Sequence, residues 1–245
     1  MGIIDRLFGA RPGVPGDQAV DDDFLDKQAW REESGGPALF ALAARPGMVA
    51  GGRVAWREVF KGVPNVVYMT GWEKRGAPVL APVGVLWHWT AGKPTAKRTA
   101  PSLQICINGR PDVPGPLVQL LVGSDGVIYV IASGRANHAG LGHQPLLKRI
   151  REGLPPAGSA KALGLANTGG SGGALIGVEV ENDGKAPFTA AQLVAIGNIT
   201  KAVRLRLGFN DAQAGAWHHR AWTNRKIDYD DAKAAQVYAL ARKLP

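Results

Sequence analysis

Five histidines are the side chains of this sequence best suited to bind a metal or to move a proton near neutral pH. They are His88, His138, His143, His218 and His219. His88 lies near the end of the apolar run 83–89, where a polar side chain must find a hydrogen-bond partner or line a site. His218 and His219 open the run HHRAWTNRKIDYD, which is rich in side-chain donors and contains the carboxylate of Asp228.

This combination is compatible with a hydrolytic zinc site. Such a site uses about three nitrogen or oxygen ligands and keeps one position open for water. His88, one of the paired histidines and Asp228 supply that set if the two segments lie side by side. No short helical motif with two histidines is present, so hydrogen-bonded core histidines are the alternative. Cys106 is the only cysteine, which excludes an internal disulfide and a cysteine-rich metal cluster.

The elements that position these residues follow from apolar patterns. The run 83–89 stops at Thr-Ala-Gly, as a buried strand does. Segments 117–123 and 127–132 flank Ser-Asp-Gly and predict a hairpin. In 174–182, apolar residues alternate with Gly177 and two glutamates, Glu179 and Glu181. This alternation predicts a strand with one buried face and one face that offers carboxylates.

Helices are expected between and after these strands. The clearest begins at Thr189, where Gln192 completes a capping box, and it ends at Gly208. Further helices are expected at 54–60, 144–154 and 230–244, with a short one around 24–33. Strands interleaved with helices predict an α/β domain whose mixed central sheet is flanked by helices.

Charge and composition divide the chain of 245 residues in two. Residues 1–53 hold six basic and eight acidic side chains and therefore have a net negative charge. Because the whole chain has a net charge of +9, residues 54–245 have a net charge of +11. The first part is also rich in Gly, Ala and Pro without a sustained period. We therefore expect an acidic appendage or linker at 1–53 and a single basic domain at 54–245.

The chain carries no pattern typical of membrane insertion or export. No apolar run approaches the roughly 18–20 residues of a membrane helix. The start, MGIIDRLFGARPG, lacks the apolar core and cleavage site of a signal peptide. We expect synthesis in the cytoplasm without a signal peptide and no stable membrane insertion.

Five ordered blocks carry a resemblance to a known family. They are GWEKRG (71–76), VLWHWTAG (85–92), the segment 101–140 that ends in ANHAG, GVEVENDG (177–184) and HHRAWTNRKIDYD (218–230). Together they resemble the type 2 N-acetylmuramoyl-L-alanine amidases, zinc hydrolases related to peptidoglycan recognition proteins. The resemblance runs from about residue 54 to the end and is greatest to endolysins of actinobacterial phages.

The resemblance implies a Zn²⁺ site and its ligands. His88 matches the first ligand, Asp228 the last, and Lys226 the lysine before it. Alignment on HRAW selects His219 as the second histidine, whereas an ungapped count selects His218, and we prefer His219. The remaining histidine would then be a neighbour of the site.

The resemblance also implies catalytic and substrate-binding residues. Glu179 matches an acidic residue that faces the metal, and with Lys226 it is expected to be catalytic. His138 and Asn137, in ANHAG, and Trp89, which stands where many members have a second histidine, are expected to bind substrate, with turn capping as the alternative for His138. Glu181 and Asp183 are expected to be solvated. Val118 stands about where some relatives have a tyrosine near the metal, so help from a tyrosine is not expected.

The implied function is hydrolysis of the amide between N-acetylmuramic acid and L-alanine in bacterial peptidoglycan, by a monomeric phage or prophage endolysin that reaches the wall after the membrane is permeabilised. Two alternatives are a peptidoglycan-binding module without catalysis and a cytoplasmic amidase that recycles wall fragments. The +11 charge and seven tryptophans raise the possibility of nucleic-acid binding. Because the basic residues are scattered, we expect no nucleic-acid partner.

Overall fold

The structure is a computed structural model that describes residues 47–49, 51–78, 82–167, 170–226 and 230–243. The expected appendage, with its helix at 24–33, lies almost wholly outside these ranges. The domain boundary at residue 53 therefore stays a prediction. Strand β1 (Met48–Val49) does pair with β2 (Arg53–Val54), so the chain on both sides of residue 53 packs together.

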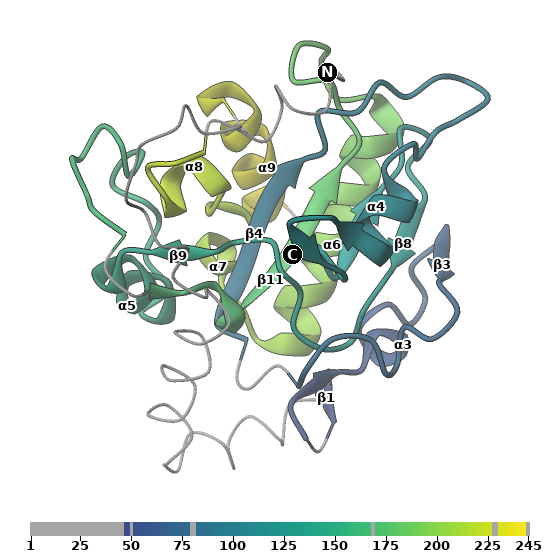
Figure 1. Cartoon of the computed structure of the whole chain (residues 1–245), viewed down its shortest axis with the longest axis horizontal. Helices are drawn as coiled ribbons and strands as arrows, with labels where there is room; N and C mark the ends of the chain where they lie inside the picture. Colours follow the sequence, from purple (N-terminus) through teal and green to yellow (C-terminus); the bar gives the residue numbers. More distant parts are fainter. Residues whose placement is uncertain (1–46, 50, 79–81, 168–169, 227–229, 244–245) are drawn as a thin grey trace.

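A five-stranded mixed sheet forms the centre of the molecule, in the order β3-β8-β7-β11-β4 (Figure 1). These strands are β3 (Val66–Tyr68), β8 (Ile128–Val130), β7 (Leu120–Val122), β11 (Leu175–Val180) and β4 (Gly84–Trp89). Strand β11 runs parallel to both β4 and β7, whereas β7 and β8 form the expected antiparallel hairpin. The prediction of an α/β fold with a mixed central sheet is confirmed.

Helices cover both faces of this sheet. On one face lie α3 (Trp56–Val59), α6 (Ala190–Leu207) and α9 (Asp231–Lys243), and α7 (Asp211–Gly215) packs beside β4 with Ala214 in the core of this face and Ala212 in the cluster of the other face. On the other lie α4 (Leu103–Asn108) and α5 (Gln144–Arg151), which pack in separate apolar clusters with Leu121 of β7 and Leu86 of β4. Helix α8 (His219–Trp222) is a short turn beside β4. No described helix is long and apolar enough to span a membrane.

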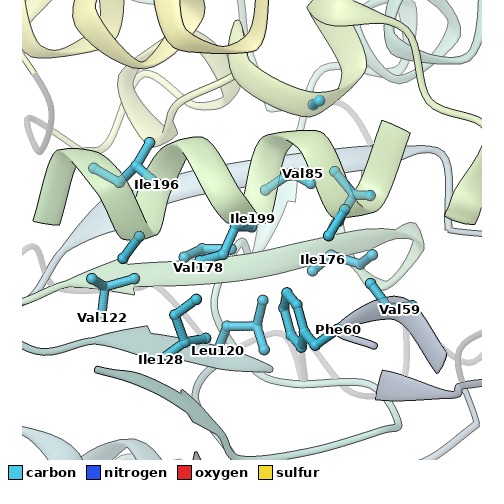
Figure 2. Close-up of a cluster of buried hydrophobic side chains, with 14 of the residues drawn as sticks. Val59, Phe60, Val85, Leu120, Val122, Ile128, Ile176, Val178, Ile196 and Ile199 are labelled. Carbon is cyan, nitrogen blue, oxygen red and sulfur yellow. The ribbon is translucent and has the colours of Figure 1, made fainter. Parts of the chain in front are cut away.

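The main core lies between the sheet and α6. Figure 2 shows Ile196 and Ile199 of α6 above Val178 of β11, with Leu120 and Ile128 on the far side of the cluster. All five side chains are fully buried. At about 1.5–3 kcal/mol for each large apolar side chain, burial of this kind holds α6 against the sheet. The apolar residues of β11 therefore pack in the core, and the residues that alternate with them face α4 on the other side of the sheet.

Both ends of α6 agree with the sequence. Thr189 accepts a hydrogen bond from the backbone N–H of Gln192, and the Gln192 side chain accepts one from the N–H of Thr189. Gly208 follows in the left-handed conformation, with φ of 67°. The expected helices at 54–60, 144–154 and 230–244 are present as α3, α5 and α9, each beginning or ending a few residues inside the expected range.

The hairpin strand expected from residue 117 begins at Leu120 instead. The N–H of Gln119 still donates to the carbonyl of Gly177 on β11 at 3.2 Å, but the N–H of Gly177 donates to the side-chain Oε1 of Gln119 at 2.7 Å and not to a backbone carbonyl. The remaining elements are short: β5 (Gly109–Arg110) with β6 (Val113–Pro114), β9 (Leu141–Gly142) with β10 (Gly170–Ser171), and the 3₁₀ turn Gly172–Ala174.

Candidate active site

The register of the two central parallel strands sets the site. Glu179 of β11 lies directly beside His88 of β4. Paired residues of neighbouring strands project to the same face. Trp87 and Val178, their chain neighbours, belong to the core cluster beneath α6. His88 and Glu179 therefore share the opposite face, and His88 is 1% exposed whereas Glu179 is partly exposed.

The outer edge of β4 brings in the paired histidines. The N–H of Trp87 donates to the carbonyl of Trp217 at 3.0 Å, and Trp87 forms an isolated parallel bridge with His218. Because of this pairing, α8 begins at His219, which lies next to His88. The two Nδ1 atoms lie 2.9 Å apart and the rings are nearly perpendicular, at 80°. Of the two candidate histidines, His219 is the one whose ring meets His88, and His218 is buried at the N-terminus of α8.

His138 occupies the other side of His88. Its Nδ1 lies 3.0 Å from Nε2 of His88, and its Nε2 lies 3.1 Å from the carbonyl oxygen of Leu175. Gly177 makes room for this ring, because a Cβ there would lie 2.6 Å from Cγ of His138. Both ring nitrogens of His138 are thus engaged by the protein. The expectation that His138 binds substrate stays a prediction.

These contacts fix where the protons lie. A carbonyl oxygen only accepts, so Nε2 of His138 must donate to Leu175. Burial holds the pKa of His138 well below its usual value, although its hydrogen bond to Leu175 opposes this. The ring is therefore neutral, and its Nδ1 accepts from Nε2–H of His88. In neutral His88 the remaining lone pair is on Nδ1, the atom that faces His219.

The ring of His219 has the same arrangement of donor and acceptor nitrogens as the ring of His88. Its Nε2 lies 3.3 Å from the carbonyl oxygen of Ala139, so this nitrogen carries the proton. In the neutral ring, Nδ1 of His219 also holds a lone pair, directed at Nδ1 of His88. Two lone pairs 2.9 Å apart repel unless a proton or a metal cation lies between or beside them. The pair is therefore arranged to bind a positive charge.

The histidine pair fits the requirements of a zinc site. Two nitrogens at about 2.0–2.1 Å from a tetrahedral ion lie roughly 3.3 Å apart, close to the separation of the two Nδ1 atoms. The described residues contain no group of three His, Cys, Asp or Glu side chains arranged to hold a metal. The third expected ligand, Asp228, lies outside the described residues, so two expected ligands are seen to converge and the third stays a prediction.

The expectation that the Glu181 carboxylate is solvated is wrong. It is 1% exposed and accepts hydrogen bonds from the Thr90 hydroxyl at 2.6 Å and from the Ser102 N–H at 2.6 Å. Burial raises the pKa of Glu181, and these hydrogen bonds oppose that rise. The strand alternation gave the correct face, but α4 and the loop after β4 cover that face at Glu181. Glu181 thus joins the end of β4 to the start of α4.

The other expected site residues lie in different settings. Trp89 projects to the face opposite His88, where Nζ of Lys233 lies 4.7 Å above its ring. Asn137 is exposed and donates to the carbonyl of Pro114 at 2.9 Å. Lys226 follows α8 and is partly exposed. The structure therefore brings together His88, His219, His138 and Glu179, and it places Trp89 away from them.

Cys106 lies in the cluster beneath α4. Burial, followed by the charges of Glu179 and Glu181, raises the pKa of its thiol well above the usual value. The thiol is therefore protonated at neutral pH.

Sequence reasoning missed the supports of the site. The carbonyls of Leu175 and Ala139 orient His138 and His219, and Gly177 provides the space for the His138 ring. Backbone carbonyls leave no signal in a sequence. Gly177 did leave one, since a glycine inside a strand indicates close approach by another group.

The chain is similar to one protein family and, more distantly, to solved structures. The family model described as N-acetylmuramoyl-L-alanine amidase (Amidase_2) matches residues 78–231. No curated protein matches the chain significantly. Among solved structures, AmpD in selenomethionine form matches with a TM-score of 0.45 and 20% identity, covering 80% of this chain and 97% of AmpD. The endolysin N-acetylmuramoyl-L-alanine amidase LysCS from Clostridium intestinale URNW matches with a TM-score of 0.36 and 14% identity, covering 60% of this chain and 78% of LysCS.

Because both structural matches have TM-scores below 0.5 and low sequence identity, neither of them supports a conclusion about function. The family match does support one, because it spans more than half of the chain and includes both histidine-bearing segments. The chain therefore belongs to the N-acetylmuramoyl-L-alanine amidase family, whose substrate is peptidoglycan.

Proposed function

We propose that this chain is a zinc-dependent amidase that cuts the bond between the lactyl group of N-acetylmuramic acid and L-alanine of the stem peptide. The observation that carries the proposal is the pair of Nδ1 atoms of His88 and His219, 2.9 Å apart, with Glu179 beside His88 on the same face of the sheet. Family membership supplies the substrate class.

His88, His219 and Asp228 would hold the metal. The chemistry that zinc would supply there is a bound water whose pKa would be lowered toward about 7, and a polarised carbonyl. Glu179 takes a proton from the attacking water and passes it to the leaving amine, as a general base and then a general acid. Lys226 stabilises the negative oxygen of the tetrahedral intermediate, a contribution of about 3–4 kcal/mol for one donor.

The reaction itself is tested by mass spectrometry of purified peptidoglycan after digestion. The proposal expects intact stem peptides that begin at L-alanine, together with glycan strands that retain the free lactyl group. Cut glycan strands or cut cross-bridges would contradict it. Binding to the wall without any release, from protein that contains no zinc by elemental analysis, would instead identify a non-catalytic binding module.

The role of Glu179 is tested by Glu179→Gln, which removes the basic carboxylate with little change in size. We expect turnover to fall by at least 10²-fold, within the range typical for loss of a general base, while zinc content stays at the wild-type value. Glu58→Gln is the matched control, because Glu58 is exposed on α3 beneath the other face of the sheet. A Glu179→Gln protein that digests walls at the wild-type rate would remove Glu179 from the mechanism.

We further propose that the enzyme acts as an endolysin of phage or prophage origin. The resemblance of its sequence blocks to actinobacterial phage endolysins supports this role. In this proposal the monomeric protein is held in the cytoplasm of the host until the membrane is opened. Expression in a susceptible host should leave cells intact until a membrane-permeabilising agent is added, and rapid lysis should follow. Activity confined to soluble wall fragments would favour a recycling amidase.

A further inference from the structure

The two residues His138 and Ala139 contact both histidines of the candidate metal site. Nδ1 of His138 meets Nε2 of His88 at 3.0 Å, and the carbonyl of Ala139 meets Nε2 of His219 at 3.3 Å. The same carbonyl accepts from Nε1 of Trp222 at 3.2 Å. One dipeptide thus contacts, in each of the two rings, the nitrogen remote from the proposed metal position.

This dipeptide is itself firmly held. Nε2 of His138 donates to the carbonyl of Leu175, at the start of β11. A Cβ on Gly177 would lie 2.6 Å from Cγ of His138, and one on Gly172 would lie 2.3 Å from Cβ of Ala139. The glycines allow His138 and Ala139 to lie directly against the chain that carries Glu179. The position of the His138 ring is therefore set by the sheet.

We propose that His138 and Ala139 position the metal ligands, with His138 selecting the tautomer and ring orientation of His88, and that His138 is not primarily a substrate contact. The inference rests on the proposed zinc function. The polarity runs in one direction: Leu175 accepts from His138, and His138 accepts from His88. Nδ1 of His88 is thereby left with its lone pair directed at Nδ1 of His219. Hydrogen-bond partners of this kind typically change metal affinity by 10–100-fold when they are removed.

Two substitutions separate hydrogen bonding from bulk. In His138→Gln, the amide N–H₂ can donate to Leu175 and the amide oxygen can accept from His88, so the same polarity is retained. In His138→Leu, the volume is largely kept but the acceptor is lost. His143→Leu is the matched control, because His143 precedes α5 and lies outside the histidine cluster.

The first measurement is zinc affinity by competition with a chelator. We expect His138→Leu to weaken zinc binding by 10–100-fold, and we expect His138→Gln and His143→Leu to stay within about threefold of the wild type. Wild-type zinc affinity in His138→Leu would overturn the proposal. Equal loss in His138→Leu and His138→Gln would also overturn it, because the Gln variant restores the hydrogen bonds.

The second measurement needs no metal. Long-range ¹H–¹⁵N spectra of the chelator-stripped, ¹⁵N-histidine-labelled protein report which ring nitrogen of His88 carries the proton. We expect the Nε2–H form in wild type and His138→Gln, with slow exchange of this proton against solvent, and fast exchange in His138→Leu. A protonated Nδ1 in wild-type His88 would overturn the proposal.

The two measurements also separate this inference from the proposed function. If the protein digests walls and binds zinc equally well with His138→Leu, the amidase function stands and the positioning role fails. If the protein neither binds zinc nor digests walls, the proposed function fails, and the spectra of His88 still decide whether His138 sets its tautomer.

Discussion

At the scale of single residues, the surroundings of a carboxylate decide its role. Glu179 lies on β11 and Glu181 comes directly after its last residue, Val180, so the two carboxylates are two residues apart in the alternation. Glu181 is buried and bonded to Thr90 and Ser102, so it serves the structure. Glu179 lies beside His88 and is partly exposed, so it remains accessible for proton transfer.

His138 makes the stability of the metal-stripped protein depend on pH. Its pKa is lowered in the folded state, chiefly by burial, whereas in the unfolded chain it lies near 6.5. Below about pH 6.5 the unfolded chain therefore binds a proton that the folded protein does not, and stability falls as the pH falls. The slope from one such group is at most about 1.4 kcal/mol per pH unit.

This dependence is measured by urea unfolding at pH 7.5 and 5.5 in the presence of a chelator. Wild type should lose more stability than His138→Gln over this interval. The raised pKa of Glu181 acts in the opposite direction, but it is common to both proteins and cancels in the comparison. Identical losses in the two proteins would contradict the prediction.

At the scale of elements, β11 connects the core to the site. Ile176, Val178 and Val180 pack in the core beneath α6, whereas Gly177 and Glu179 face the histidines. Strand β4 supplies His88 on one side of β11 and pairs with the chain before α8 at its own outer edge. The site therefore depends on three neighbouring backbone segments held in register.

Gly177→Ala tests this arrangement without altering a histidine. The new Cβ would lie 2.6 Å from Cγ of His138, so the ring must move away from Leu175 and His88. We expect zinc affinity to fall about as much as in His138→Leu, while the circular dichroism spectrum stays that of the folded protein. A Gly177→Ala protein with wild-type zinc affinity would show that the close packing of His138 is unimportant.

At the scale of the whole molecule, we expect the net positive charge to favour the approach to an anionic substrate. Residues 54–245 carry a net charge of +11. Such a surface attracts anionic wall polymers, and salt screens the attraction because the Debye length falls from about 10 Å at 0.1 M to about 3 Å at 1 M ionic strength.

We therefore expect the rate of wall lysis to fall steadily as ionic strength rises from 0.05 to 0.5 M. Walls stripped of their anionic polymers should show a much weaker dependence. The measurement is the turbidity decrease of each wall preparation at fixed enzyme concentration. A rate on intact walls that does not change with salt would mean that the positive charge has no part in substrate approach.

The sequence by itself determined the elements and the residue types of the site. Periodicity located β4, β11 and α6, because apolar spacing and capping residues are local properties of the chain. The blocks around His88, Glu179 and His219 identified the family, because several motifs in a fixed order are more specific than any one of them. Asp228 and Lys226 were inferred in the same way and keep their roles as predictions.

Only the tertiary structure decided which of these residues meet. The choice of His219 over His218 as the neighbour of His88 depends on the pairing of the Trp217–His218 backbone with β4, a contact between residues about 130 positions apart. The burial of Glu181 depends on α4, and the tautomer of His88 depends on the carbonyl of Leu175. Side-chain types and local spacing are written in the sequence, whereas long-range pairing and the direction of hydrogen bonds arise only when the chain is folded.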